Sequence, residues 1–240
     1  MCGRYTLTTP QQILQAAFAL TSLKGSDAGA TNDPRLDHPR YNIAPTQKVA
    51  IIANRPPAQG RKIEFFRWGL IPSWAKDMKI SHSLINARSE TAAEKPSFRS
   101  AFRSRRCLVL ADAFYEWKAV PPVKGAKAIK TPTCIRMKSH APFAFAGLWE
   151  TWIAPEGAPI ESCTILTTEP NPLLAQVHDR MPVILSPESY AKWLSPTSMS
   201  AEELQPLMKA YPENQMETFT VSPLVNSPAN ERPECMVPVN

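Results

Sequence analysis

The chain has no long hydrophobic run. No stretch reaches the ~20 consecutive apolar residues that a membrane-spanning helix needs, and apolar runs such as 107–110 have the length of buried strands. The beginning of the chain also has neither the basic and apolar pattern of a signal peptide nor the amphipathic pattern of a transit peptide. We therefore expect a protein without membrane spans, located in the cytoplasm or at the nucleoid.

Paired cysteines are missing as well. The five cysteines are odd in number, lie far apart and never form a Cys-x-x-Cys spacing, which disfavours both a disulfide framework and a zinc site. We expect no metal and no cofactor. Three of the cysteines lie inside short apolar runs and are predicted to be core residues: Cys107, Cys134 and Cys163.

Cys2, by contrast, directly follows the initiator methionine. Methionine is normally removed before a small side chain, so we expect Cys2 to become the first residue, by self-cleavage or by an aminopeptidase. Its α-amine would then titrate near ~7.7–8.0 and its thiol near ~8.5, so a fraction of each would be nucleophilic at neutral pH. Such a pair can trap an aldehyde, first as an imine and then as a thiazolidine ring. The alternative is a chance Met-Cys start without chemistry.

Regular βαβ alternation is also absent. Scattered prolines, 25 in all, or about twice the usual share, indicate short elements joined by ordered loops. The turn and hydrophobicity patterns predict strands at 48–52, 62–66, 107–110, 133–136, 143–146 and 163–166. Helices are predicted at 10–22 and 97–106 and after the capping residues Ser186 and Ser200. The expected fold is a single α+β domain over residues 1–240, with a curved, barrel-like mixed or antiparallel sheet and peripheral helices.

Basic residues are unevenly distributed in this chain of net charge +6. Residues 118–139 contain six basic side chains and no acid, and residues 88–106 contain six against two. Such clustering favours a polyanionic partner. A solvated surface that only keeps the protein soluble is the alternative.

Four local strings combine polar residues with aromatic, Gly or Pro residues. Asn86 and Arg88 would project from one face of an extended segment. Glu116 lies in an aromatic run, where desolvation would raise its pKa and suit it to proton transfer. His178 could shuttle protons, although an isolated histidine is more often structural. Trp68 and Trp74 flank a Gly/Pro segment and could stack on unpaired bases, or they could cover the core.

Taken together, these strings resemble the SOS response-associated peptidase family, the abasic-site processing proteins. The matching segments are Cys2-Gly3-Arg4, Tyr41-Asn42-Ile43-Ala44-Pro45, Trp68-Gly69-Leu70-Ile71-Pro72, Asn86-Ala87-Arg88-Ser89-Glu90-Thr91, Asp112-Ala113-Phe114-Tyr115-Glu116-Trp117 and His178-Asp179-Arg180-Met181-Pro182. The resemblance implies binding to single-stranded DNA at an abasic site and a covalent link from the N-terminal cysteine to the sugar aldehyde, which would shield the lesion during the DNA damage response.

The resemblance also implies a role for each matched residue. Cys2 would be the nucleophile, Asn86 would orient the sugar or the cysteine backbone, Glu116 would relay protons and His178 would assist ring opening. Among the DNA-binding residues, Arg4 and Arg88 would clamp flanking phosphates. The cleft that keeps the strand unpaired would be shaped by Asn42, Pro45 and Trp68.

Two other functions remain open at this stage. One is an N-terminal-nucleophile peptidase or amidase that uses Cys2 on an amide bond. The other is a noncovalent single-strand binder. Weak lyase activity, by β-elimination from the imine, is compatible with the covalent hypothesis. We expect a monomer, and we interpret the stretches 23–40 and 119–132 as loop expansions.

Overall fold

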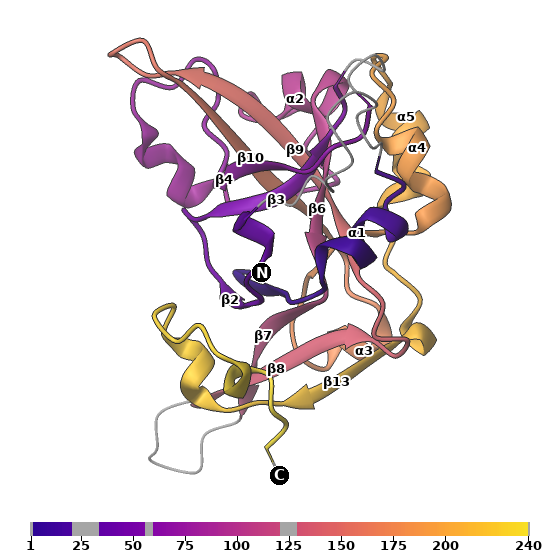
Figure 1. Cartoon of the computed structure of the whole chain (residues 1–240). Helices are drawn as coiled ribbons and strands as arrows, with labels where there is room; N and C mark the ends of the chain where they lie inside the picture. Colours follow the sequence, from indigo (N-terminus) through magenta and orange to yellow (C-terminus); the bar gives the residue numbers. More distant parts are fainter. Residues whose placement is uncertain (1, 21–33, 56–59, 121–128, 240) are drawn as a thin grey trace.

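The computed structural model describes residues 2–20, 34–55, 60–120 and 129–239. Its centre is a sheet that closes on itself, in the order β4 (Glu64–Trp68), β3 (Lys48–Ala53), β6 (Arg106–Ala111), β9 (Phe143–Ile153) and β10 (Pro159–Thr168) (Figure 1). The closing pair, β10 with β4, is parallel, and the other pairs are antiparallel. The predicted α+β fold with a curved, barrel-like mixed sheet is confirmed, while the extent of the domain, 1–240, stays a prediction.

A second, antiparallel sheet lies below this barrel in Figure 1. Its order is β13 (Met216–Thr220), β8 (Ile129–Met137), β7 (Ala113–Val120), β1 (Arg4–Leu7) and β2 (Arg40–Ile43). The chain passes from the barrel to this sheet at Asp112, between β6 and β7, where the carboxylate accepts hydrogen bonds from Thr8 and Thr9. Three short strands attach to β10 and β9: β5 (Asn86–Arg88), β11 (Met181–Pro182) and β12 (Ile184–Leu185).

The helices are short and lie around the sheets (Figure 1): α1 (Gln11–Ala17), α2 (Arg99–Ser104), α3 (Pro172–Ala175), α4 (Tyr190–Trp193) and α5 (Ala201–Leu204). The predicted helix 10–22 is therefore shorter than expected, and residues 21–22 lie outside the described residues. The predicted helix 97–106 is present as the shorter α2, whose phenylalanine face is buried and whose face with Arg99 and Arg103 is exposed. The capping box of Ser200 and Glu203 is present. Among the described residues no helix is long and apolar enough to cross a membrane.

Five of the six predicted strands lie within longer elements, and the sixth, 62–66, is displaced by two residues to β4. The stretch 119–132 is only partly a loop, because its ends continue β7 and β8 and Ala119 pairs with Lys130. Its middle, 121–128, and most of the other predicted expansion, 23–33, lie outside the described residues. The rest of that expansion forms a 3-10 turn at 34–36 and the first residue of β2.

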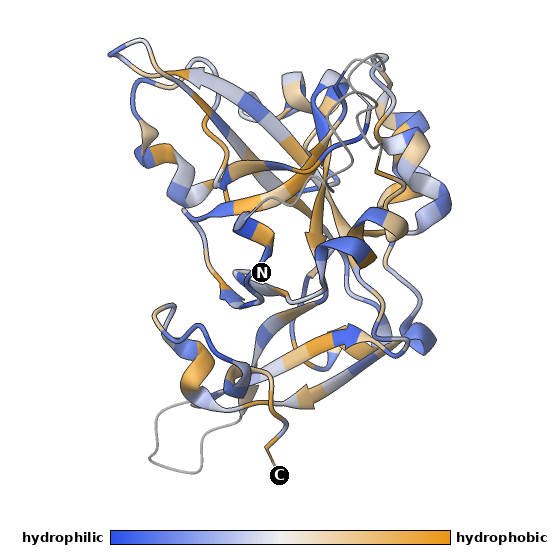
Figure 2. Cartoon of the chain, viewed as in Figure 1, coloured by the Kyte–Doolittle hydropathy of each residue, from blue (hydrophilic) through white to orange (hydrophobic). Residues whose placement is uncertain are grey.

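The core fills the barrel, whose strands carry the most apolar segments (Figure 2). Every residue of β6 is buried. The predicted core cysteines Cys107, Cys134 and Cys163 are fully buried, as is Cys235. Their placement confirms the packing role expected from their apolar surroundings.

Two members of the basic cluster 88–106 are engaged by the protein itself and are not free for a polyanionic partner. Arg106 is completely buried and donates to the carbonyls of Phe102, Arg103, Trp193, Ser195 and Thr197. Arg105 pairs with Glu150 at 2.7 Å. These two arginines stabilise the fold, and the exposed positive charge of this cluster comes from its other members.

Tyr5 provides a stability test within the core. Its ring packs edge-on against Trp68 and Phe145, but its fully buried hydroxyl has no hydrogen-bond partner among the described residues. Because burying an unpaired hydroxyl is costly, Tyr5→Phe should raise the free energy of unfolding by about 1 kcal/mol. Tyr115, whose hydroxyl donates to the Tyr41 carbonyl at 2.9 Å, is the matched control.

Tyr115→Phe should instead lower the free energy of unfolding by about 1 kcal/mol, because it leaves a hydrogen bond unmade. Urea denaturation of the two variants measures both values, with unchanged m-values as the check on two-state unfolding. Equal losses of stability in both variants would contradict this description of the core.

Candidate active site

Strand pairing brings Cys2 and Glu116 together. Strand β1 pairs with β7 with Arg4 opposite Tyr115, so the residues that precede Arg4 run alongside Glu116. Both side chains are buried, Cys2 completely and Glu116 almost completely. Cys2 and Glu116 are more than a hundred positions apart in the sequence, and the pairing of β1 with β7 brings them into one site.

Asn86 joins this site from the barrel. Its strand, β5, pairs in parallel with β10, and its Nδ2 donates to the Cys2 carbonyl at 2.8 Å. The Oδ1 of the same amide is buried and has no hydrogen-bond partner among the described residues. The side chain therefore fixes the backbone of Cys2 and leaves an acceptor available for a further donor.

Glu116 and His178 face each other, with 4.0 Å between Glu116 Oε2 and His178 Nε2. Burial raises the pKa of Glu116 from 4.5 to about 7, and the negative charge of Asp179 acts in the same direction. Burial lowers the pKa of His178. The expected effect of the aromatic run on Glu116 is confirmed, and Glu116 can exchange protons near neutral pH.

The other ring nitrogen of His178 has two neighbours. Its Nδ1 lies 3.0 Å from the backbone N–H of Arg180 and 2.7 Å from Asp179 Oδ1. A neutral ring accepts from Arg180, and a protonated ring donates to Asp179. Both protonation states thus have a partner at Nδ1, while Nε2 keeps facing Glu116. This arrangement suits a proton carrier.

Arg180 anchors the segment that carries His178. Its guanidinium donates to both carboxylate oxygens of Glu90, each at 2.8 Å, and to the Thr167 carbonyl of β10 at 2.7 Å. This bidentate pair joins the segment after β5, with Asn86, to the segment with His178. We refer to Glu90 and Arg180 as the anchoring pair.

The thiol of Cys2 is less acidic than its sequence suggests. Burial raises its pKa well above the ordinary value, and the neighbouring charge of Glu116 adds to this effect. Burial therefore disfavours the thiolate while Met1 precedes Cys2, and the thiolate fraction of a chain that begins at Cys2 stays a prediction. The thiol rests in its protonated form, so a neighbouring base must accept its proton when the sulfur reacts.

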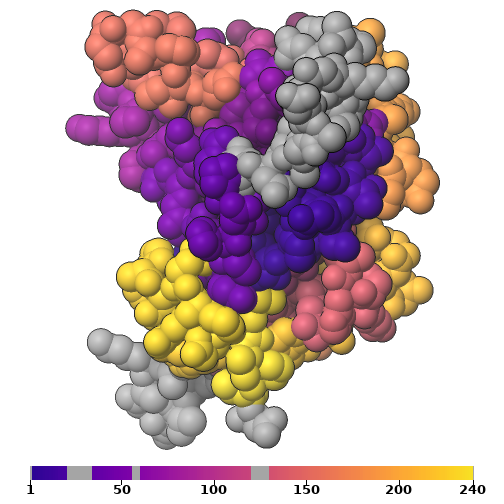
Figure 3. All heavy atoms as spheres, in the orientation of Figure 1, coloured from indigo at the N-terminus to yellow at the C-terminus, as the bar shows by residue number. Residues whose placement is uncertain are grey.

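Arg4 and Asn42 contact the C-terminal segment. Arg4 Nη1 donates to Asn42 Oδ1 at 2.9 Å and to the Val225 carbonyl at 2.7 Å. Asn42 is fully buried, and its Nδ2 donates to the carbonyls of Ser227 and Asn230, each at 2.9 Å. Figure 3 shows this segment, in yellow, against the N-terminal strands. As placed, Asn42 cannot touch DNA, and Arg4 is largely occupied by the protein.

The remaining predicted DNA contacts differ in exposure. Trp68 ends β4, is fully buried and donates to the Ile85 carbonyl at 2.9 Å, so it supports Asn86 and cannot stack on a base. Pro45 is half-buried. Trp74 is 57% exposed, and Arg88 is exposed without an ion pair to any described residue. The described residues contain no cluster of His, Cys, Asp or Glu that could hold a metal ion.

Comparison with known proteins adds an independent observation. The profile of the SOS response associated peptidase (SRAP) family matches residues 1–228. The chain belongs to the SRAP family. The abasic site processing protein YoqW of Bacillus subtilis (strain 168) is 44% identical over 234 residues, or 98% of each chain. The abasic site processing protein HMCES of Rattus norvegicus is 30% identical, over 100% of this chain and 76% of its own.

Solved structures agree with the SRAP fold described above. A crystal structure of a Bacteroides thetaiotaomicron protein matches the whole of both chains with a TM-score of 0.80 and 26% identity. Another, from Bordetella bronchiseptica, matches 92% of this chain and 100% of its own with a TM-score of 0.71 and 28% identity.

The anchoring pair was not predicted by the sequence. Glu90 and Arg180 lie inside two of the SRAP motifs, but their sequence separation of 90 residues hides the contact. Asp179 was missed in the same way, although it directly follows His178. Only their membership of the motifs could have singled them out, because neither charge nor periodicity distinguishes them from surface residues.

Proposed function

We propose that this SRAP protein captures abasic sites in single-stranded DNA by forming a thiazolidine through Cys2, after removal of Met1, and thereby shields the lesion. The observation that carries the proposal is the convergence of Asn86, Glu116 and His178 on Cys2, in a site where Glu116 has a pKa of about 7. The names of YoqW and HMCES, which are called abasic site processing proteins, point to the same class of lesion.

The chemistry begins at the α-amine of Cys2. The amine nitrogen attacks the aldehyde carbon of the ring-opened sugar, and the carbonyl oxygen leaves as water to give an imine. The thiol then adds across the imine, so that sulfur bonds to the carbon and the thiol proton passes to nitrogen. The net change is one C–N bond and one C–S bond formed, with one water released.

The neighbouring residues supply proton transfers and alignment. Glu116 takes a proton from the attacking amine and returns it to the leaving hydroxyl. His178, held by Arg180 and Asp179, transfers a proton as the sugar ring opens. Asn86 fixes the Cys2 carbonyl, and its unpartnered Oδ1 accepts from the amine. The imine is also the point from which weak lyase activity, by β-elimination, would start.

The residues proposed for DNA binding fall into two groups: exposed side chains that touch the DNA, and more buried side chains that hold the binding cleft in shape. Arg88 contacts a phosphate beside the lesion, and Trp74 stacks on an unpaired base, because both side chains are exposed. Arg4, Asn42, Pro45 and Trp68 act mainly by shaping the cleft.

A denaturing gel tests this proposal against the peptidase or amidase alternative. Purified protein is mixed with a single-stranded oligonucleotide that has one abasic site, next to Cys2→Ala, Cys2→Ser and an undamaged oligonucleotide. A heat-stable band is expected only for the unsubstituted protein with the lesion. An amidase would instead give no such band and would turn over small amides. A noncovalent binder would retain equal affinity in Cys2→Ala and form no band.

The anchoring pair allows a test of positioning. Glu90→Gln removes the charge that holds Arg180, so His178 should lose its fixed orientation, and the rate of crosslinking should fall by about tenfold. The pKa of His178, followed by NMR, should change in Glu90→Gln and return in Glu90→Asp. Glu94→Gln, an exposed carboxylate on the same segment, is the control and should change neither value.

An unchanged His178 titration in Glu90→Gln would contradict the positioning role, even if the rate fell. A loss of rate without that spectroscopic change would indicate a merely structural role for the pair.

A further inference from the structure

A groove separate from the Cys2 site lies at the carboxyl ends of the parallel strands β5 and β10. Its volume is about 820 Å³, and its walls come from the segment after β5, the end of β10, α2, α5 and the residues after α5. A neighbouring hollow of about 560 Å³ shares lining residues with it, among them Phe102 and Glu202. Of the residues that form or anchor the Cys2 site, only Glu90 lines this groove.

Two buried hydroxyl groups of the groove have no hydrogen-bond partner among the described residues. They belong to Ser89 and Thr168, which line the groove and are 9% and 8% exposed. The two residues lie next to each other, because Arg88 pairs with Thr167 in the parallel ladder and each hydroxyl belongs to the following residue. Since burying an unpaired hydroxyl is costly, these groups suit a ligand that enters the groove and forms hydrogen bonds with them.

The groove is acidic, although the chain has a net charge of +6. Its lining contains four glutamates against one basic residue, Lys209. Glu169 directly follows Thr168, and Glu202 lies across the groove on α5. Both glutamates are exposed and form no ion pair with any described residue. The surplus negative charge repels phosphate groups, so this groove does not suit a DNA strand, and it attracts a cation.

The bottom of the groove is apolar. Phe102 and Met208 line it and are 1% and 7% exposed, next to the half-buried Ala93, Pro170 and Ala201. A methionine side chain adapts to apolar partners of different shape. Carboxylates, unpaired hydroxyls and an apolar bottom together fit a ligand that has both a cationic group and an apolar group.

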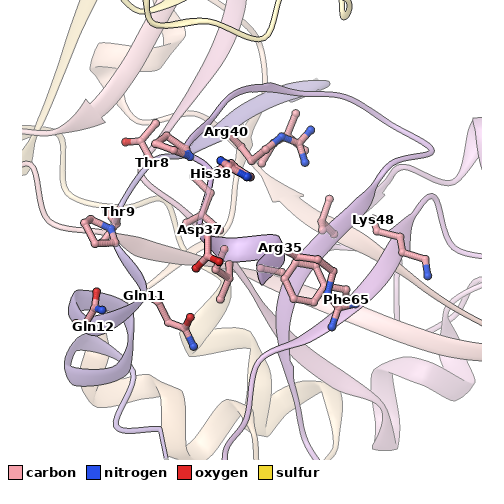
Figure 4. Close-up of a pocket in the computed structure, with 17 residues that line it drawn as sticks. Thr8, Thr9, Gln11, Gln12, Arg35, Asp37, His38, Arg40, Lys48 and Phe65 are labelled. Atoms are coloured by element: carbon pink, nitrogen blue, oxygen red, sulfur yellow. The ribbon is translucent and has the colours of Figure 1, made fainter. Parts of the chain in front are cut away.

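A different cavity, drawn in Figure 4, has several of its polar groups engaged by the protein itself. The hydroxyls of Thr8 and Thr9 donate to the Asp112 carboxylate. Arg35 lies on the ring of Phe65, with 3.9 Å between the guanidinium carbon and the ring centroid. Its volume, about 230 Å³, is also well below that of the groove. The groove beside β10 therefore has the stronger features of a ligand site.

We propose that this groove binds a basic segment of a partner protein, in which lysine or arginine side chains flank an apolar one. One cationic side chain would donate to the Ser89 and Thr168 hydroxyls and pair with Glu169. The apolar side chain would pack on Phe102, and a second cation would pair with Glu202. Phe102 and Glu202 also line the neighbouring hollow, so the site continues beyond one cavity and suits an extended segment better than a small cation. The proposal does not depend on the covalent reaction proposed above.

A peptide titration of the full chain, followed by NMR, tests the proposal. The probe is acetyl-Lys-Ser-Leu-Ser-Lys-amide, whose lysines and leucine project from one side when the peptide is extended. It should shift the backbone amide signals of Ser89, Glu169 and Ala201. The double variant Glu169→Gln/Glu202→Gln should weaken binding by about threefold to tenfold, because each amide keeps the size of the side chain but loses its charge.

The matched control is Glu156→Gln/Glu188→Gln, at two exposed glutamates outside the groove. It makes the same change in net charge and should bind the probe as the unsubstituted protein does. Equal weakening in both double variants would indicate attraction by the overall charge and would overturn the proposed site.

Thr168→Val separates a role of the hydroxyl in binding from a role in the fold. The valine keeps the shape of the side chain but cannot accept from a cation, so the probe should bind about threefold more weakly. Because the hydroxyl has no partner among the described residues, the urea midpoint of unfolding should not fall. A lower midpoint with unchanged binding would contradict the proposed contact of this hydroxyl with the ligand.

Three further probes test the chemistry of the ligand. The peptide acetyl-Lys-Ser-Ser-Ser-Lys-amide, which lacks the leucine, should bind about threefold more weakly, and acetyl-Glu-Ser-Leu-Ser-Glu-amide should cause no shifts. The proposal is overturned if the first probe, at about 5 mM, leaves the groove signals unchanged. Spermine is the third probe. Tighter binding of spermine than of the first peptide, with no loss of affinity when the leucine is removed, would identify a polyamine site and overturn the proposal of a protein partner.

Discussion

Glu116→Gln is expected to slow formation of the covalent adduct by a factor on the order of 10²–10⁴, the usual contribution of a positioned acid or base. The amide keeps the size of the carboxyl group but cannot take a proton from the amine. In the unsubstituted protein the rate should rise as the pH passes through about 7, where the Glu116 carboxyl ionises. In Glu116→Gln the inflection near pH 7 should be absent, and only the rise from deprotonation of the Cys2 α-amine, near ~7.7–8.0, should remain. Rates from quenched time courses between pH 5 and 9 measure both effects.

The same substitution should stabilise the fold at high pH. The folded pKa of Glu116, about 7, lies above its ordinary value of 4.5, so the native state binds the proton more tightly than the unfolded state. The stability that this proton provides is present below pH 4.5 and is lost as the pH rises through 7. Glu116→Gln should therefore match the unsubstituted protein at pH 4.5 and exceed it by roughly 3 kcal/mol at pH 8.

Glu116→Gln should thus slow adduct formation but stabilise the fold at high pH, and this combination makes the test specific. A substitution that merely damaged the fold would lower both the rate and the stability. Glu156→Gln, at an exposed glutamate, is the control and should change neither. An unchanged rate in Glu116→Gln would remove this carboxyl group from the proposed mechanism.

Arg106→Met is expected to lower the free energy of unfolding by about 3–5 kcal/mol. The methionine fills similar space, but the substitution removes the donors that the fully buried Arg106 supplies to five carbonyl oxygens. These carbonyls belong to the end of α2 and to the segment after α4, so the loss should loosen the contact between the two. Urea denaturation gives the value.

Arg103→Met, on the exposed face of α2, is the matched control and should change stability by less than about 0.5 kcal/mol. If both variants lost the same stability, the effect would come from a general reduction of positive charge, and the buried hydrogen bonds of Arg106 would not explain it.

The local patterns of the sequence were sufficient for the strands of the barrel and for β8 of the second sheet, but not for the other strands of that sheet. Strands such as 107–110 are apolar and bounded by turn residues, so their pattern is local. Strand β1 has only four residues, and its pairing of Arg4 with Tyr115 depends on contacts far along the chain. Strand β7 coincides with the aromatic run around Glu116, which was interpreted as a site and not as a strand.

Trp68 illustrates why exposure could not be predicted. The Gly and Pro residues after it suggested a loop, but β4 extends through Trp68 and the turn begins only at Gly69. A Cβ on Gly69 would lie 2.7 Å from the Ser81 carbonyl oxygen, and its φ of 118° is strained for other residues. Trp68 itself contacts the Tyr5 ring and the Ile85 carbonyl, both distant in the sequence, and no local pattern records these contacts.

The sequence was sufficient to predict which residues form the candidate site, but not their pKa values. Cys2, Asn86, Glu116 and His178 were expected and lie together, whereas the raised pKa of the Cys2 thiol depends on burial that sequence patterns cannot measure. The occupation of Arg4 and Asn42 by the C-terminal segment likewise depends on contacts across more than 180 residues.

Intact mass spectrometry of the adduct is the most direct test of the proposed chemistry. The protein is mixed with an abasic oligonucleotide without any reductant and then treated with iodoacetamide under denaturing conditions. We predict a species whose mass equals the chain without Met1 plus the oligonucleotide, less one water, plus one carbamidomethyl group on each of the four other cysteines. The Cys2 sulfur should be unalkylated because it lies in the thiazolidine ring. An adduct that retains Met1, that takes up iodoacetamide at Cys2 or that requires a reductant would contradict thiazolidine formation at an N-terminal Cys2.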